Sequence, residues 1–231
     1  MSKEPKNVGS MLTWIGDMAN LITNHGLWKI VIAVLVLSFC ISVISIALNP
    51  EPILDKIEQI LDDREAANRN FRTKNDPLVR SELQKIVFEL GASRATVMEF
   101  HNGRENPSSL GFWYAEMTYE QTNGKVYSIN QQYRNVNLSL LNISTVLHRD
   151  GYWYGTMDEF RKIDPNLADV IQGNGTNWIA FLLLKSVSGE LGILEISFEQ
   201  EPYDKKAVGQ AIRTSGVSIA SMLDYKAHMK K

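Results

Sequence analysis

The sequence is poor in cysteine and has no surplus of either charge, and each shortage excludes a class of protein. Cys40 is the only cysteine among the 231 residues, which excludes an internal disulfide and a cluster of thiolate metal ligands. The 24 basic and 26 acidic side chains leave a formal net charge of -2. Because no basic surplus would attract phosphates, we expect that nucleic acid is not a partner.

The sequence also lacks the short motifs that carry common chemistry. It contains no glycine-rich phosphate loop after a strand, no serine elbow and no dinucleotide fingerprint. His25, His148 and His228 fall on three different predicted elements, without the spacing of metal ligands. We therefore predict that the protein is not an enzyme, and that it holds no catalytic residues, no metal and no cofactor.

One long stretch lacks charge altogether. The run from Ile30 to Leu48 has no charged side chain, and as a helix it matches the ~30 Å hydrocarbon core of a bilayer. A buried core helix is seldom apolar on every face, and a signal peptide would start nearer Met1 and end in a small-residue cleavage site. The run predicts one transmembrane helix, anchored at the interface by Trp28 and Lys29.

The flanks of this helix predict its orientation. Three lysines precede it, at positions 3, 6 and 29, against Lys56 and Arg64 soon after it. By the positive-inside rule, residues 1–29 form a cytoplasmic tail, and the chain after the span lies outside the cytoplasm. Within the tail, Met11 to Ile22 follows the pattern of an amphipathic helix on the inner membrane surface.

Small hydroxyl residues share one face of the predicted span. Ser38, Ser42 and Ser45 follow a spacing of four and then three residues. Such a face allows helices to approach closely in lipid, which predicts a homo-oligomer. The alternative is that each hydroxyl bonds to the carbonyl four residues earlier in its own helix.

The rest of the chain predicts an α+β domain. Residues 49–75 are expected to form a charged helical stalk, and a second helix is expected to begin at Asp76-Pro77 and end at Gly91. Alternating and β-branched patterns then predict an antiparallel sheet with helices on one face, within a domain of residues 76–231. The predicted strands are Ala95–Phe100, Phe112–Gln121, Lys125–Asn130, Tyr152–Thr156, Trp178–Ser186 and Glu190–Phe198.

The predicted helices of this domain lie between and after the strands. They are Leu138–Leu147, one or two short helices within Met157–Gln172, and a final helix from Asp204 to Lys226.

One strand end gathers groups that could form a site. Glu99, His101 and Asn102 lie within three positions of one another, with Tyr119 expected on a neighbouring strand and Trp153 in an aromatic set. Convergence of these side chains would make a binding site for a ligand or a partner. The alternative is a strand end that ties down its loop, beside aromatic residues of the core.

The order of elements over Asp76 to His228 resembles that of the GAF domain, a relative of PAS domains. The layout of the full chain, with a short tail, one transmembrane helix and one domain outside the cytoplasm, resembles the holin of T-even bacteriophages. That resemblance implies a host inner-membrane protein that assembles into lesions, releases endolysin and binds an antiholin through its periplasmic domain. It also implies that the lipid bilayer is a partner.

Two other functions fit the same layout. One is a membrane-anchored sensory protein whose GAF-like domain binds a ligand, and the other is a scaffold in a membrane or a virion. A sensor normally passes its signal to an output domain, and the chain ends without one at Lys231. The sequence therefore favours the holin as the main hypothesis.

Overall fold

The computed structural model describes residues 13, 16–17, 23, 26–105 and 111–225. The chain divides into two compact units, Met1–Glu65 and Ala66–Lys231. The second unit therefore starts before the predicted domain boundary at residue 76. The predicted amphipathic helix from Met11 to Ile22 falls largely outside the described residues.

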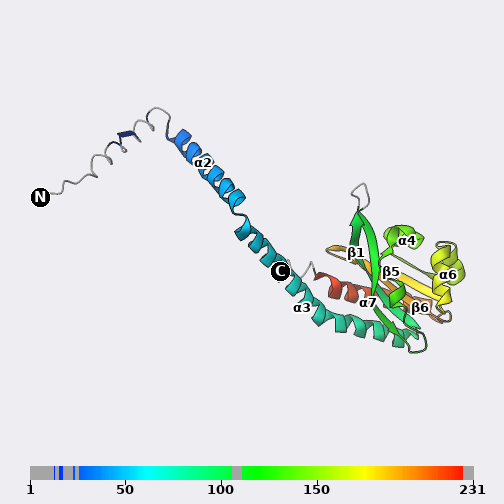
Figure 1. Cartoon of the computed structure of the whole chain (residues 1–231). Helices are drawn as coiled ribbons and strands as arrows, with labels where there is room; N and C mark the ends of the chain where they lie inside the picture. The colour runs from blue at the N-terminus through cyan, green and yellow to red at the C-terminus, as the bar shows by residue number, and fades with distance from the viewer. Residues whose placement is uncertain (1–12, 14–15, 18–22, 24–25, 106–110, 226–231) are drawn as a thin grey trace. The chain divides into compact units, whose positions relative to one another are not determined.

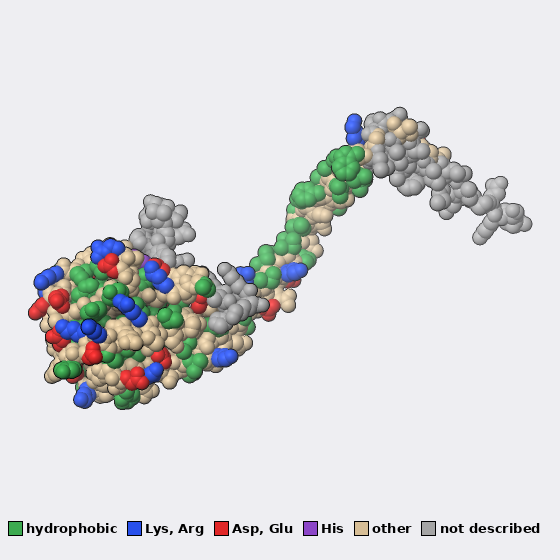
Figure 2. Space-filling view, turned by 180° about the vertical axis from the view of Figure 1, so that it is seen from behind, with side chains coloured by type: hydrophobic (Ala, Val, Ile, Leu, Met, Phe, Trp, Pro, Cys, Tyr) green, Lys and Arg blue, Asp and Glu red, His purple; other side chains and the backbone are tan. Residues whose placement is uncertain are grey.

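Helix α2, Leu27–Leu48, contains the predicted membrane segment. It is long and apolar enough to cross a membrane over Val31–Leu48, and none of that stretch is buried inside the structure. Figure 2 shows its hydrophobic side chains as a band along the helix. The hydroxyl of Ser42 donates to the carbonyl of Ser38 at 2.9 Å, so this serine adopts the intrahelical alternative.

Helix α3, Glu51–Leu90, runs without interruption through the position where a second helix was expected to start, so that prediction was wrong. Pro77 stands inside the helix rather than at its first turn. Asp76 does not cap a new helix; its carboxylate accepts a hydrogen bond from the hydroxyl of Tyr119 at 2.6 Å. Asp-Pro marks a helix start only where the preceding residues are not helical themselves.

Six antiparallel strands form one sheet, which confirms the antiparallel α+β class. Their order is β3-β2-β1-β6-β5-β4. The predicted hairpin of the two most apolar strands is present as β5 and β6 (Figure 1). The strands are β1 Arg94–Glu105, β2 Gly111–Thr122, β3 Val136–Asn137, β4 Tyr152–Thr156, β5 Trp178–Ser186 and β6 Gly189–Phe198.

The predicted strand Lys125–Asn130 is absent. The turn before it is real, since Gly124 has a φ of 79° and the side chain of Asn123 accepts from the amide of Lys125 at 2.9 Å. The chain after the turn does not pair with β2, because Glu120 holds it instead by its backbone at Ile129. The third strand forms later, as the two residues of β3.

Four helices follow in the described part of the chain, with two short 3-10 turns before them. The helix expected at residue 138 starts only at residue 142, while the short helices and the final helix are confirmed. The carboxylate of Asp164 accepts from the amides of Asn142 and Leu167, and so joins the starts of α4 and α6. The elements are η1 Asn130–Gln132, η2 Leu138–Leu140, α4 Asn142–Asp150, α5 Met157–Arg161, α6 Pro165–Gly173 and α7 Lys205–Leu223.

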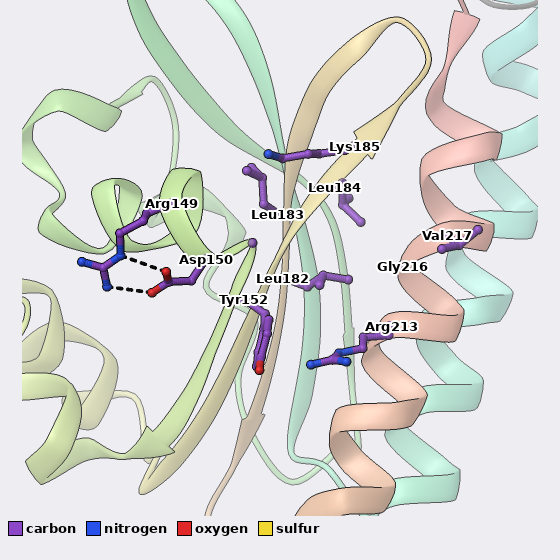
Figure 3. A pocket seen from close by; sticks show the side chains of 11 residues that line it. Arg149, Asp150, Tyr152, Leu182, Leu183, Leu184, Lys185, Arg213, Gly216 and Val217 are labelled. Carbon is purple, nitrogen blue, oxygen red and sulfur yellow. Dashed lines mark hydrogen bonds and ion pairs between the residues drawn. The ribbon is translucent and has the colours of Figure 1, made fainter.

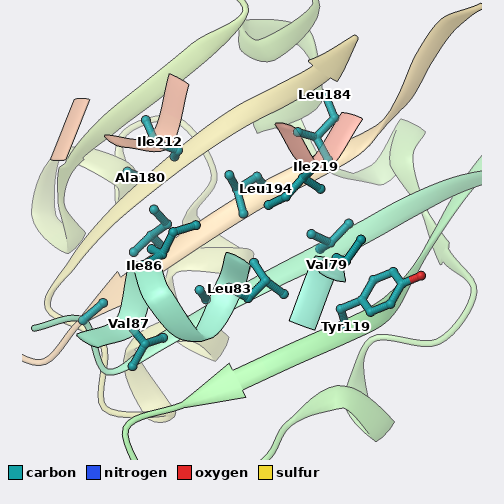
Figure 4. Packing of buried hydrophobic residues seen from close by; sticks show 14 of the residues in the cluster. Val79, Leu83, Ile86, Val87, Tyr119, Ala180, Leu184, Leu194, Ile212 and Ile219 are labelled. Carbon is teal, nitrogen blue, oxygen red and sulfur yellow. The ribbon is translucent and has the colours of Figure 1, made fainter. Parts of the chain in front are cut away.

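The described helices cover both faces of the sheet, not one face as predicted. On one face α3 and α7 lie side by side, with Leu83 and Ile86 of α3 facing Ile219 of α7 over the strands (Figure 4). On the other face α4, α5 and α6 bury Ile143, Phe160 and other apolar residues against the sheet. Alternation along the strands supplies both cores, since successive side chains point to opposite faces.

Candidate functional site

The face of the sheet under α4, α5 and α6 holds charged side chains in its interior. Arg94 is 2% exposed, and Glu195 is 4% exposed. Thr96, on β1, lies opposite Glu120 of β2 on one side and Glu195 of β6 on the other. The strand register therefore places two carboxyls, one guanidinium and one hydroxyl in a single buried group.

Arg94 and Glu120 form an ion pair whose polar atoms are matched by other groups. The Nε of Arg94 donates to Glu120 at 2.9 Å, and one Nη donates to the carbonyl of Tyr127 at 2.8 Å. Glu120 also accepts from the amide of Ile129 at 3.0 Å and from the hydroxyl of Ser128. Buried charges are tolerated when paired and hydrogen-bonded in this way, and here they fix the loop before η1.

Glu195 has no cation of its own, because Arg94 is already paired with Glu120. Its carboxyl accepts from the hydroxyl of Ser197 at 2.8 Å. Burial raises the pKa of Glu195, and the charge of Glu120 raises it further, against the opposing effects of Ser197 and Arg94. If Glu195 ionised, its negative charge would therefore have no cation paired with it.

The hydroxyl of Tyr133 is buried beside this acid and makes no hydrogen bond of normal geometry with a described residue. Burial raises the pKa of Tyr133, and the charge of Glu195 adds to the effect, while Arg94 and the side chain of Asn174 act in the opposite direction. The hydroxyl of Thr96 is likewise buried without a partner. Such orphaned groups are rare, and each costs roughly 1–3 kcal/mol.

A cavity of about 20 Å³ joins Glu195 and Tyr133. Apolar side chains from both the sheet and the helices complete its wall. Its lining is Met98, Tyr133, Val136, Leu141, Ile143, Leu167, Ile171, Phe181, Ile193 and Glu195. A cavity of this size has room for about one water molecule, so a larger ligand would have to open it.

The opposite face carries a second polar cluster, which attaches α3 to the sheet. Arg72 donates two hydrogen bonds to Glu99, at 3.0 and 2.5 Å, and one to the hydroxyl of Tyr119 at 2.8 Å. Burial would lower the pKa of Arg72, but its hydrogen bonds to Glu99 and the charge of Glu99 outweigh this and raise it. Burial and the hydrogen bond to Asp76 raise the pKa of Tyr119. We call this arrangement the clamp, in which Arg72, Glu99, Tyr119 and Asp76 are hydrogen-bonded to one another.

No family model and no curated protein matches the chain. Solved structures do. The blue-light-absorbing form of the PixJ GAF domain of Thermosynechococcus elongatus superposes with a TM-score of 0.51 and 8% identity, over 69% of this chain and 93% of that one. The phycocyanobilin-bound GAF domain of a cyanobacterial phytochrome gives a TM-score of 0.50 and 10% identity, over 72% and 96%.

A red/green cyanobacteriochrome in its red-light-absorbing state gives a TM-score of 0.50 and 11% identity, over 68% of this chain and 98% of that chain. The chain has a GAF fold. At such low identities the similarity establishes the architecture of the GAF domain and leaves its ligand to be argued from its own residues.

The GAF domain separates the residues that were predicted to form one site. Glu99 and Tyr119 meet, but through Arg72 in the clamp. His101 stacks on Tyr114, with ring centroids 6.0 Å apart, and its Nε2 is buried without a hydrogen-bond partner among the described residues. The side chain of Asn102 lies outside the described part of the chain.

Trp153 lies far along the sheet from these residues, on the edge strand β4. It packs on Phe160 and Phe181, with ring centroids 5.2 and 6.4 Å away, and belongs to the core under α5. It therefore shares a face with Glu195 and Tyr133 rather than with Glu99 and Tyr119. The described residues contain no group of three or more acidic, His or Cys side chains that could hold a metal ion.

Sequence reasoning missed Arg94, Glu195 and Tyr133. Arg94 is the first residue of β1, next to the buried Ala95, and Glu195 lies in the mainly apolar second half of β6, next to the buried Ile196. A charged residue at an inward position of a buried strand is uncommon, and that signal could have identified both residues. Tyr133 gave no signal, since its segment has no regular period.

Proposed function

We propose that this protein is a membrane-anchored GAF module that binds a small molecule with an apolar body and an amino group. The observation that supports this proposal is the cavity beside Glu195 and Tyr133, where a buried acid and an unpartnered hydroxyl meet apolar walls. Small-molecule sites have this composition, with a few convergent polar groups in an apolar lining. A membrane anchor is supported by α2.

The charge of the site is the reason for proposing an amino group on the ligand. Arg94 and Glu120 neutralise each other at 2.9 Å, so ionisation of Glu195 leaves one negative charge in a region of low dielectric constant. A protonated amine would compensate that charge and donate to the carboxylate and to the oxygen of Tyr133. A carboxylate ligand would be repelled by Glu195.

The cavity has one wall that can open at low cost. Tyr133, Val136 and Leu141 come from a segment of short elements, of which β3 pairs only two residues with β2. Few backbone bonds hold such a segment, so local opening costs less there than in the central strands. Bilins, which some GAF neighbours bind, are not our choice of ligand, because drug-sized pockets measure roughly 300–1,000 Å³ and this cavity measures about 20 Å³.

Calorimetric titration of the full chain in lipid nanodiscs tests the proposal, with isobutylamine as the probe and isobutanol as its uncharged analogue. We expect isobutylamine to bind more tightly than isobutanol, because only the amine compensates Glu195. Glu195→Gln should abolish the preference. Tyr133→Phe should weaken it by less, since one hydrogen bond is lost and no charge.

Glu116→Gln is the matched control, because it makes the same substitution on β2, opposite Glu99 and away from the cavity. It should leave amine binding unchanged. Equal binding of the amine and the alcohol would overturn the proposed ligand class, and absence of binding by either at millimolar concentration would overturn the proposed site.

A holin of the kind found in T-even bacteriophages is a second candidate, favoured by α2. Its apolar side chains are exposed over the whole span, and Ser38 and Ser45 remain on one face for helix packing. In this proposal the chain assembles as a homo-oligomer in the host inner membrane, anchored by Trp28 and Lys29. Its GAF domain would lie in the periplasm and bind an antiholin.

Expression in a bacterium together with a cytoplasmic endolysin that lacks an export signal tests the second candidate. Abrupt loss of turbidity after a delay, absent when residues 30–48 are deleted, is the expected result. Continued growth with the full chain in the membrane would overturn the holin and leave the ligand-binding module.

A further inference from the structure

The edge strand β4 and helix α7 border a groove that neither the cavity nor the clamp uses. Two adjoining hollows, of about 430 and 350 Å³, share Arg213 as a lining residue. Figure 3 shows the larger of these two hollows, with the side chain of Arg213 pointing toward Tyr152. Gly216 allows α7 to approach β5 there, since a Cβ at this position would lie 2.2 Å from Leu182.

Basic side chains outnumber acidic ones in the lining of the groove, although the chain as a whole has no basic surplus. The two hollows contain five basic side chains and one acidic side chain, Asp150. The basic residues are Arg149, Lys185, Lys205, Lys206 and Arg213. Arg149 pairs with Asp150, Lys185 with Glu190 and Lys205 with Glu201.

Lys206 and Arg213 form no ion pair with a described residue. Arg213 lies over the ring of Tyr152, 4.3 Å from its centroid. The ring of Tyr154 stacks on that of Tyr152, with centroids 6.2 Å apart. Two uncompensated cations and two half-exposed tyrosines therefore face solvent together, a combination that favours an anionic partner over a neutral one.

The edge strand β4 has backbone N–H and C=O groups at these tyrosines that do not pair with β5. The amide of Leu183 donates to the carbonyl of Gly151 at 2.8 Å, which makes residues 151 and 183 a hydrogen-bonded pair. Because such pairs alternate along an antiparallel ladder, Trp153 also bonds to β5, while Tyr152 and Tyr154 direct their N–H and C=O groups outward. No described strand lies on that side of β4.

We propose that this groove binds an extended, acidic peptide segment of a partner protein, which adds to the sheet beside β4. The outward backbone groups of Tyr152 and Tyr154 would pair with the peptide, and Lys206 and Arg213 would contact its acidic side chains. Two copies of this chain joined by their own β4 edges would bring these cations together. Like charge thus disfavours a second copy as the occupant.

The test uses the full chain in phosphatidylcholine nanodiscs and a fluorescent octapeptide of alternating aspartate and valine. The matched peptide has lysine in place of aspartate. We expect anisotropy to report binding of the acidic peptide alone, and hydrogen exchange of residues 151–156 to slow when it binds. The double variant Lys206→Gln, Arg213→Gln should bind about tenfold more weakly, because two charged contacts are lost.

Two further variants separate charge from backbone pairing. Tyr154→Pro removes an outward N–H at a sheet edge where proline is tolerated, and should also weaken binding. The double variant Lys125→Gln, Lys162→Gln removes the same charge from exposed sites outside the groove and should bind normally. An equal loss of peptide affinity in this control would show that the net charge of the protein, not the groove, causes the effect, and would overturn the proposal.

Two other outcomes would also overturn it. One is unchanged exchange of residues 151–156 at millimolar peptide. The other is binding to phosphatidylserine vesicles, lost in the groove variant, with no binding of the acidic peptide, which would identify a membrane surface as the occupant.

Discussion

The two faces of the GAF sheet are built from the same strands but hold different side chains. Under α3 and α7 the interior is apolar, and the polar clamp of Arg72, Glu99 and Tyr119 is partly open to solvent. Under α4, α5 and α6, Arg94 and Glu195 are fully enclosed. The first face supplies stability through packing, and the second gives up some stability to hold the polar group on which the proposed ligand site depends.

Arg94→Met should produce the largest loss of stability, because it leaves the buried carboxylate of Glu120 unpaired. We expect a loss of about 3–5 kcal/mol in the free energy of unfolding. Urea titration of the full chain, followed by the fluorescence of buried Trp178, measures it. The double variant with Glu120→Gln should recover part of the loss, and a double variant as unstable as the single one would contradict a charge-pairing origin.

Leu83→Ala tests the apolar face. Leu83 is 0% exposed under α3, so the substitution leaves a cavity and should cost about 2–5 kcal/mol. Leu78→Ala on the same helix removes a side chain that is 48% exposed, and should change the free energy of unfolding by less than about 0.5 kcal/mol. Similar losses in both variants would contradict a packing origin, because alanine favours the helix at least as well as leucine at both positions.

Glu195→Gln should raise stability, and the gain should depend on pH. Burial raises the pKa of Glu195 in the folded protein, so the folded state holds this proton more tightly than the unfolded chain does. The stability linked to the proton is complete below the unfolded pKa of about 4.3 and is lost as pH rises through the folded pKa.

The gain from Glu195→Gln should therefore be small in acid and largest at neutral and alkaline pH. It should amount to about 1.4 kcal/mol for each unit by which the folded and unfolded pKa values differ. Thermal unfolding of both proteins across a pH series measures it. A gain that is constant with pH would contradict the titration of Glu195.

Arg72→Lys should have the smallest effect. The side chain of Arg72 is 36% exposed, so its two bonds to Glu99 are screened by solvent and contribute about 1 kcal/mol or less. The loss in the free energy of unfolding should be smaller in high salt, and urea titrations at low and high ionic strength would measure the difference. A loss as large as that of Arg94→Met would remove the contrast between the two faces.

The sequence predicts the parts of this fold whose signal is local. The hairpin of β5 and β6 follows from two apolar runs around Ser188-Gly189, and α2 follows from an uncharged run. The strand predicted at Lys125–Asn130 failed because Glu120 competes for the backbone that would have paired. Local propensity cannot include a partner that is set by a distant side chain.

The candidate site was harder to predict than the fold. Glu195 meets Thr96 only through the pairing of β1 with β6, which are about a hundred residues apart in the chain. Tyr133 reaches the same cavity from a segment without regular structure. The predicted group of Glu99, His101 and Trp153 rested on closeness in sequence and on residue type, and the sheet places Trp153 on a different strand and a different face from Glu99.

Pro77 lies in the turn of α3 that the clamp attaches to the sheet. Proline has no amide hydrogen, so the turn from Thr73 to Pro77 lacks one backbone hydrogen bond of the helix. The clamp attaches this part of α3 to the sheet through the hydrogen bonds of Arg72 with Glu99 and of Asp76 with Tyr119. Tyr119 in the clamp is followed in the chain by Glu120, so a single step along β2 joins the helix on one face of the sheet to the buried charges on the other.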